Sequence, residues 1–265
     1  MLSGLAQLNI ELCSRCDKTH LCPMCGHQNP DVNPITYGDM DFELLKKIRA
    51  QVEPGITISL HRDGEPTAYP RLREALVLFS DFTTSMVTHG LNLSRQKDDI
   101  IGRVTSCTIS VFRGDPDAGL QLASIKDFLE TKGNQAPQVQ IKIVGDISPE
   151  ELAPYEALNV PILRRLIHVP ISNAKYAHRN PTRPEVGICL DALHRPTVDW
   201  RGRMYLCNRL DPHEHTAIGD LNTHTLDAIW NGPKRLNMIE AHKIGRRDLA
   251  NPLCGSCLHW GTPSA

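Results

Sequence analysis

From residue 5 to about residue 172, short runs of apolar and β-branched residues alternate with longer stretches that are apolar on one face and polar on the other. This rhythm is typical of βα units that form a parallel sheet covered by helices. Six such units are about three quarters of an eight-unit barrel, so we expect the α/β fold class and a partial (β/α)6 TIM-like barrel. The predicted strands are residues 5–12, 55–60, 83–90, 104–111, 138–145 and 165–172. The predicted helices are residues 41–52, 70–82, 120–133 and 148–159, the last with Ser148 as its N-cap.

The alternation stops after residue 172. Residues 173–187 are polar and contain prolines, which indicates a linker. Residues 196–207 have the pattern of a hairpin that turns at Arg201-Gly202, and residues 225–245 that of a helix interrupted near Gly232-Pro233. We therefore predict two domains, a barrel at residues 1–175 and a smaller domain at residues 176–265.

The composition argues against two classes of partner. Hydrophobic residues make up 40% of the chain and charged residues 22%, with a formal net charge of -1. Nucleic-acid-binding proteins normally carry a basic excess, and a membrane span needs roughly 18 consecutive apolar residues. The N-terminus also lacks a basic segment followed by an apolar stretch and a cleavage site. We expect a cytoplasmic protein without a nucleic-acid or membrane partner.

Nine cysteines in such a chain favour metal or redox chemistry over disulfides, because the cytosol keeps thiols reduced. Cys13, Cys16, Cys22 and Cys25 follow the first predicted strand, at the edge of the sheet where βα folds place their chemistry. Two pairs of this kind suit a structural zinc ion. Three of the four thiols also suit an iron–sulfur cluster with one iron open to an outside ligand.

A second, widely spaced set of thiols lies in the C-terminal part of the chain. It consists of Cys189, Cys207, Cys254 and Cys257, and their spacing alone allows either a zinc ion or one four-iron cluster. A zinc-stabilised binding module without catalysis therefore remains an alternative from a different functional class.

The segment "LNIELCSRCDKTHLCPMCG" at residues 8–26 resembles the radical S-adenosylmethionine (radical SAM) enzymes. The resemblance implies a [4Fe-4S] cluster on Cys16, Cys22 and Cys25 that binds S-adenosylmethionine. The spacing here is C-x5-C-x2-C, whereas C-x3-C-x2-C is common in the family, so Cys13 stays open as the first ligand. The surrounding residues favour Cys16.

The segment "HRDGEPTAYPRL" at residues 61–72 resembles the family's Gly-Gly-Glu-Pro motif, with Asp63 in place of the first glycine. The resemblance implies that Asp63, Gly64 and Glu65 contact S-adenosylmethionine. A glycine permits close backbone approach, and a carboxylate suits the cationic amino group of the methionine moiety. Ser110, near the end of the fourth predicted strand, is the candidate ribose contact.

The C-terminal segments resemble the SPASM/Twitch extensions of radical SAM enzymes, which implies an auxiliary [4Fe-4S] cluster on the four C-terminal cysteines. The layout is similar to the sugar-alcohol dehydrogenase type with one auxiliary cluster, such as 2-deoxy-scyllo-inosamine dehydrogenase. It implies an oxidoreductase that oxidises a small polar metabolite, such as a cyclitol, an aminosugar or a nucleoside-like alcohol.

In that expected reaction, a 5'-deoxyadenosyl radical abstracts a substrate hydrogen and the auxiliary cluster accepts an electron. A flavodoxin or ferredoxin is the expected electron donor. A maturase or epimerase of a ribosomal peptide is the alternative within the family. No catalytic residue is assigned from the sequence.

Overall fold

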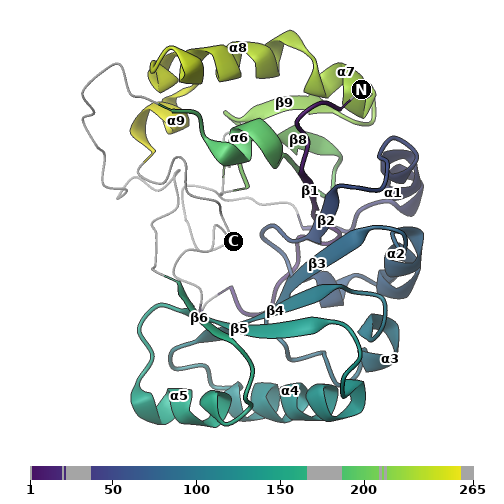
Figure 1. The fold of residues 1–265 in the computed structure, drawn as a ribbon, viewed down its shortest axis with the longest axis vertical. Coiled ribbons are helices and arrows are strands. Elements are labelled where there is room, and N and C mark those ends of the chain that lie inside the picture. Colours follow the sequence, from purple (N-terminus) through teal and green to yellow (C-terminus); the bar gives the residue numbers. More distant parts are fainter. Residues whose placement is uncertain are drawn as a thin grey trace.

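The computed structural model describes residues 2–19, 21, 37–165, 187–208, 211 and 214–257, and its centre is a mixed sheet (Figure 1). Six strands run parallel in chain order, each followed by a crossover segment, as predicted. They are β1 (Gln7–Ile10), β2 (Thr57–Leu60), β3 (Thr83–Thr88), β4 (Ser106–Phe112), β5 (Gln138–Val144) and β6 (Ile162–Arg165). The strand order places β6 at one edge of the sheet, so the barrel is partial and open.

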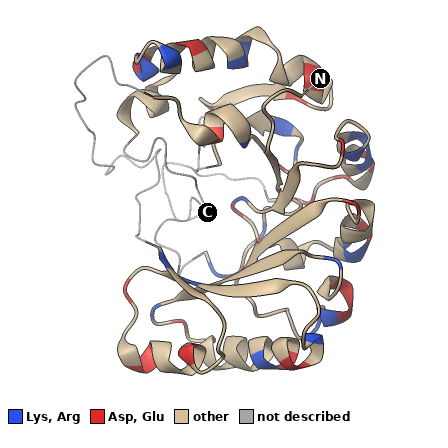
Figure 2. Cartoon of the chain, viewed as in Figure 1, with Lys and Arg blue, Asp and Glu red and all other residues tan. Residues whose placement is uncertain are grey.

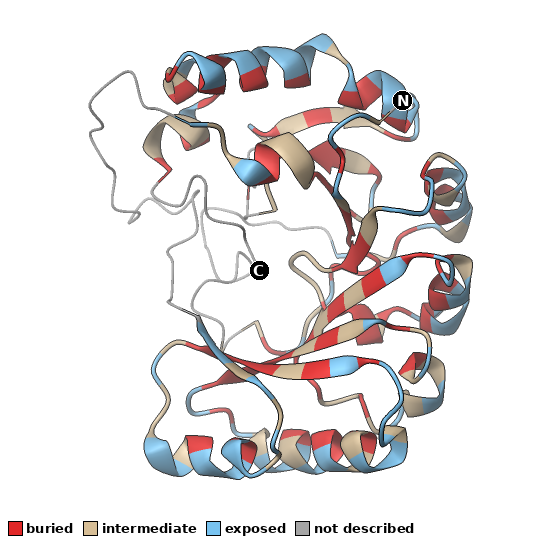
Figure 3. Ribbon diagram, viewed as in Figure 1, coloured by how far each residue is buried: buried red, intermediate tan, exposed pale blue. Residues whose placement is uncertain are grey.

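The crossover helices lie along the outer side of this sheet (Figure 1). They are α1 (Phe42–Arg49), α2 (Leu72–Leu78), α3 (Lys97–Ile100), α4 (Ala118–Lys132) and α5 (Pro149–Glu156), with the 3-10 helix η3 (Pro66–Ala68) before α2. Buried residues face the sheet and exposed ones face outward (Figure 3). Ser148 caps α5 as predicted, in a capping box in which Glu151 bonds back to the Ser148 backbone.

The C-terminal part extends the same sheet. Strand β7 (Thr197–Val198) pairs in parallel with β1, and β8 (Arg203–Tyr205) and β9 (Ala217–Asp220) follow in antiparallel pairing. The strand order is β6-β5-β4-β3-β2-β1-β7-β8-β9. The remaining helices are α6 (Leu190–His194), α7 (Leu226–Trp230), α8 (Pro233–Lys243), the 3-10 helix η4 (Arg247–Leu249) and α9 (Pro252–Ser256).

Two predicted local features of this part are confirmed. The hairpin turns at Arg201-Gly202, where Gly202 has φ +91°, a conformation that glycine adopts without strain. The predicted long helix is interrupted between α7 and α8 at Gly232-Pro233, because Gly232 caps α8 and the proline occupies its first turn.

Other predictions differ from the structure. The sixth strand starts at Ile162, before the predicted residues 165–172, of which only Arg165 belongs to β6 and residues 166–172 lie outside the described residues. Helices α3 and α6 were not predicted, because both are too short to show a helical period. The predicted boundary between residues 175 and 176 also lies outside the described residues.

The apolar interior is continuous from the barrel into the C-terminal strands. One cluster of buried side chains includes Leu8 of β1, Met204 of β8 and Trp230 of α7. Charged side chains lie mainly along the outer helices and connecting loops (Figure 2). No helix in the described part of the chain is both long and apolar enough to span a bilayer.

Candidate functional site

A cavity of about 280 Å³ lies where β1, β2 and β3 end. The loops after these strands supply all of its lining residues, as expected for a parallel α/β sheet. The lining residues are Arg15, Cys16, Asp17, Glu65, Ala68, His89 and Asn92. The cavity thus brings together a predicted cluster cysteine and the predicted ligand-binding glutamate from segments far apart in the sequence.

The two candidates for the first cluster ligand, Cys13 and Cys16, lie in different surroundings. Cys13 is 1% exposed and belongs to the apolar interior, and burial raises the pKa of its thiol to about 12. Its sulfur accepts a hydrogen bond from the Arg15 backbone N–H at 3.3 Å. Cys16 is half-buried and lines the cavity. This placement favours Cys16 as the ligand, while Cys22 and Cys25 lie outside the described residues.

Gly64 is needed because two backbones meet there. A Cβ atom on Gly64 would overlap the carbonyl group of Cys13 and lie 2.7 Å from Ser14 Cα. Next to it, the Glu65 backbone N–H donates to the Arg15 carbonyl at 2.8 Å. The expected close approach therefore involves the cysteine-rich segment itself. Asp63 and Gly64 are not among the cavity-lining residues.

Glu65 is 3% exposed, and its carboxylate ties the ends of two strands together. Oε1 accepts three hydrogen bonds, from Thr67 N–H at 3.0 Å, Thr67 Oγ1 at 2.7 Å and Thr88 Oγ1 at 2.7 Å. Oε2 accepts the His89 backbone N–H at 2.8 Å. Since an ionised carboxylate offers about four acceptor sites and Oε1 already takes three donors, the free capacity for a cationic ligand lies on Oε2.

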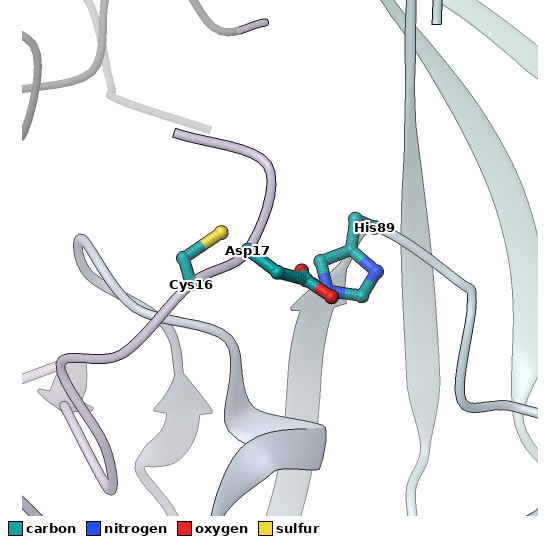
Figure 4. A group of neighbouring side chains, drawn as sticks. All are labelled: Cys16, Asp17 and His89. Carbon is teal, nitrogen blue, oxygen red and sulfur yellow. The ribbon is translucent and has the colours of Figure 1, made fainter. Parts of the chain in front are cut away.

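The Asp17 carboxylate points toward the His89 ring, with the Cys16 side chain beside Asp17 (Figure 4). His89 Nε2 lies 2.8 Å from Asp17 Oδ1 and 3.4 Å from Glu65 Oε2, although neither approach has hydrogen-bond geometry. His89 Nδ1 accepts the Leu91 backbone N–H at 3.3 Å, so the Nε2 atom carries the ring proton. One ligand atom each from Cys16, Asp17 and His89 lies within 4.8 Å of the others.

A buried lysine anchors the cysteine-rich segment to the fourth βα unit. Lys18 Nζ lies 2.6 Å from both Asp115 Oδ1 and Asp117 Oδ2, and the side chains of Lys18 and Asp115 are 2% and 1% exposed. Burial alone would lower the lysine pKa, but the two carboxylates outweigh it and raise the pKa above its ordinary value. The ion pair holds Lys18, two residues after Cys16, against the loop after β4.

A second buried charge group joins the barrel to the C-terminal hairpin. Arg62 lies over the ring of Tyr205 at 4.3 Å and approaches Asp199 Oδ2 at 3.7 Å and Glu11 Oε2 at 3.9 Å. Glu11 accepts the backbone N–H groups of Asp63 and Trp200, each at 3.3 Å. Burial raises the pKa of Glu11 to about 7, against the opposing effect of Arg62.

Ser110, the candidate ribose contact, lies on β4 and is 7% exposed. Its carbonyl accepts Gln121 Nε2 at 3.0 Å, and the same amide donates to the His89 carbonyl at 2.6 Å. Ser110 does not line the cavity. Arg164, on β6, is exposed.

The C-terminal cysteines converge although the sequence separates them widely. Cys207, which follows β8, packs against Cys257 and Leu253, and Cys254 interacts electrostatically with Cys189 and Cys257. Asn251 caps α9, and its Nδ2 donates to Cys254 Sγ at 3.1 Å. A four-thiol set held in one packed unit fits the predicted auxiliary cluster.

Several of these contacts could not be found from the sequence. Lys18 lies inside the cysteine-rich segment, but its partner Asp115 is 97 positions away. Arg62 adjoins the glycine-glutamate motif, and nothing local indicates that it meets Asp199. Signals of this kind require an alignment of covarying positions or a structure, because they arise from chain packing.

Residues 189–258 match the SPASM family, described as an iron–sulfur cluster-binding domain. No curated protein matches the sequence closely enough to serve as a relative.

Solved structures match almost the entire chain. BtrN in complex with AdoMet and 2-DOIA has a TM-score of 0.63 and 16% identity, over 97% of this chain and 95% of that one. Native anSMEcpe with bound AdoMet has a TM-score of 0.59 and 11% identity, over 90% and 84% of the two chains. Streptococcus suis SuiB bound to precursor peptide SuiA has a TM-score of 0.51 and 13% identity, over 97% and 72%.

These likenesses confirm the α/β partial-barrel fold. The SPASM match confirms the resemblance of the C-terminal segments and supports an iron–sulfur cluster in that part of the chain.

Proposed function

We propose that this chain cleaves S-adenosylmethionine reductively and oxidises a small polar alcohol. The proposal starts from its similarity to the radical SAM enzymes with a C-terminal SPASM domain. The observation that carries the proposal is the cavity that Cys16 and Glu65 share at the C-terminal ends of the parallel strands. Cys16, Cys22 and Cys25 hold the first cluster, and Cys189, Cys207, Cys254 and Cys257 hold the second.

When bound, the clusters supply one electron for cleaving the sulfonium bond and an acceptor for the electron that leaves the substrate radical as it becomes a ketone. The chain's own residues position the reactants. Glu65 Oε2 accepts the cationic amino group of the methionine moiety, since its Oε1 is already saturated. Gly64 sets the distance between this carboxylate and the cysteine-rich segment. The Asp63 backbone N–H donates a hydrogen bond to Glu11 and so fixes the same loop. Ser110 contacts the ribose.

The proposed substrate class is based on the likeness to BtrN, whose structure holds AdoMet and 2-DOIA. The TM-score is 0.63 for BtrN and 0.51 for SuiB, whose structure holds a precursor peptide. This difference supports a cyclitol, an aminosugar or a nucleoside-like alcohol over a ribosomal peptide. Oxidation of such an alcohol would remove one hydrogen atom, one proton and one electron from the carbinol group.

The peptide-modifying reaction stays the second candidate, because the fold of SuiB matches over 97% of this chain. The two reactions differ in their products. An alcohol oxidation yields a ketone, whereas peptide crosslinking lowers the peptide mass by about two hydrogens and epimerisation leaves it unchanged.

The test uses anaerobically purified protein reduced by flavodoxin or by dithionite. The protein is incubated with S-adenosylmethionine and a panel of cyclitols and aminosugars. We expect one molecule of ketone for each molecule of 5'-deoxyadenosine formed. A substrate deuterated at the carbinol carbon is expected to transfer its deuterium to 5'-deoxyadenosine. Colourless protein that contains zinc and no iron would refute the enzyme and support the zinc-stabilised binding module.

Cysteine variants distinguish the cluster ligands from the cysteines that bind no cluster. We expect C16A to lose 5'-deoxyadenosine formation and about four iron atoms per chain. C107A is the matched control, because Cys107 is a fully buried cysteine on β4 that belongs to neither predicted cysteine set. C13A is expected to keep its iron. Loss of iron from C13A but not from C16A would show that Cys13 is the first ligand.

A further inference from the structure

A buried arginine lies among the cysteines of the C-terminal set. Arg247 begins η4, between α8 and α9, and is 1% exposed. Three of the four cysteines, Cys257, Cys254 and Cys189, act on it electrostatically. Burial lowers the pKa of Arg247, and these thiolates oppose that effect. An arginine retains its proton in proteins, so a full positive charge faces the proposed auxiliary cluster.

Backbone packing fixes the position of this arginine. Gly255 lies between Cys254 and Cys257, and a Cβ atom on it would be 3.0 Å from Asp248 Cα and 3.2 Å from Asp248 Cβ. The turn that carries Arg247 therefore packs directly on the turn that carries two of the cysteines. The same turn leads through Asn251, whose side chain bonds both the Cys254 backbone and its sulfur.

Another buried side chain lies beside Cys189. The Cys189 backbone N–H donates to His242 Nδ1 at 3.3 Å, and His242 is 1% exposed. The side chain of the preceding residue, Arg246, is 43% exposed, and its Nη2 atom lies 2.9 Å from Asp248 Oδ2. Arg247 is thus a buried cation on which three of these cysteines act.

We propose that Arg247 is a positioning residue that sets the reduction potential of the auxiliary cluster and so makes it a better electron acceptor. The inference rests on the proposed function, because it assumes a four-iron cluster on the four C-terminal cysteines. A [4Fe-4S] cluster with four thiolate ligands is anionic, and reduction adds a further negative charge. A fixed positive charge in a region of low dielectric stabilises the reduced state more than the oxidised one and raises the potential.

The test is a redox titration of the holoenzyme followed by electron paramagnetic resonance. Adding S-adenosylmethionine identifies the transition of the first cluster, because only that cluster binds it, and the other transition is the auxiliary one. In R247Q we expect the auxiliary cluster to be at least tenfold harder to reduce, about 59 mV for one electron. R247K keeps the charge and should lie close to wild type. R246Q, the neighbouring exposed arginine, should leave the potential unchanged.

Each outcome decides the proposal. An unchanged auxiliary potential in an R247Q protein with wild-type iron content overturns it. If R247Q loses the auxiliary cluster while R247K retains it, the charge is again decisive, because both variants lack the guanidinium. Loss from both variants overturns the proposal, since packing would then be the cause. Wild-type protein without a second cluster would overturn the proposed function itself, and this inference with it.

Discussion

Lys18 Nζ lies 2.6 Å from Asp115 Oδ1, and both side chains are almost completely buried. This ion pair connects the cysteine-rich segment after β1 with the loop after β4, two segments that no local sequence signal joins. Removing Asp115 would leave Lys18 with the exposed Asp117 as its carboxylate partner, which is more costly than losing a surface pair. The pair therefore fixes Lys18, two residues after Cys16, against the loop after β4.

D115N should destabilise the protein by about 3–5 kcal/mol and lower the iron content of the first cluster. D117N is the matched control, because Asp117 contacts the same Lys18 Nζ but its side chain is 44% exposed. Its effect should stay below about 1 kcal/mol. Thermal unfolding and iron analysis of the anaerobic proteins measure both effects. Equal losses in the two variants would show that burial of the pair does not matter.

G64A should be destabilised by about 1–3 kcal/mol and lose 5'-deoxyadenosine formation, because its methyl group would push Cys13 and Ser14 away from the loop that carries Glu65. G119A is the control, since a Cβ atom at Gly119 in α4 meets nothing within 4 Å. Unfolding temperature and turnover are the measurements. A G64A protein with wild-type turnover would contradict the close approach of these two segments.

E65Q should raise the KM for S-adenosylmethionine at least tenfold, about 1.4 kcal/mol in transition-state binding. In E65Q the amide NH2 group would face hydrogen-bond donors in either orientation. These donors are Thr67 and Thr88 on the Oε1 side and the His89 backbone N–H on the Oε2 side. T88V removes one donor to Oε1 and leaves Oε2 intact, so its effect should be smaller. Steady-state 5'-deoxyadenosine formation measures the series, and an unchanged KM in E65Q would count against the contact.

Glu11 should make stability depend on pH. Its pKa is about 7 in the folded protein, above the ordinary value of 4.5. Between these pH values the unfolded chain releases the proton while the folded one keeps it, so the stabilisation falls as pH rises toward 7 and is lost above it. The full change amounts to about 3 kcal/mol.

E11Q carries a neutral amide that resembles the protonated acid, so it should remove this pH dependence. Its unfolding temperature relative to wild type should rise as pH increases from about 5 to about 8. E53Q, at an exposed glutamate, should show no such trend. A constant difference between E11Q and wild type over this range would mean that Glu11 is ionised throughout.

The sequence identified those elements whose causes are local. Ser148 and Glu151 form the predicted capping box within four residues, and Gly202 provides the positive φ at which the hairpin turns. The grouping of the C-terminal cysteines agrees with the packing of Cys207 against Cys257, and the grouping of the first set stays a prediction because Cys22 and Cys25 lie outside the described residues. The strands β2 to β5 lie where alternation placed them, since burial of both sheet faces produces a visible apolar run.

The sequence set the start of the sixth strand at residue 165, whereas β6 begins at Ile162, because the mixed segment Ile162–Arg165 pairs with β5 through its backbone and has no clear apolar run. The sequence also did not show that β7 pairs with β1 and so joins the C-terminal part to the barrel sheet. Backbone pairing does not depend on side-chain identity, so strand partners cannot be deduced from one sequence.

By itself, then, the sequence determined the βα order and the turn and cap positions, because each follows from conformational preferences over a few residues. Only the tertiary structure decided that Lys18 meets Asp115, that Arg62 joins Glu11 to Asp199, and that Arg247 lies among three cysteines. These charges come from distant parts of the chain and interact strongly because folding removes water from around them.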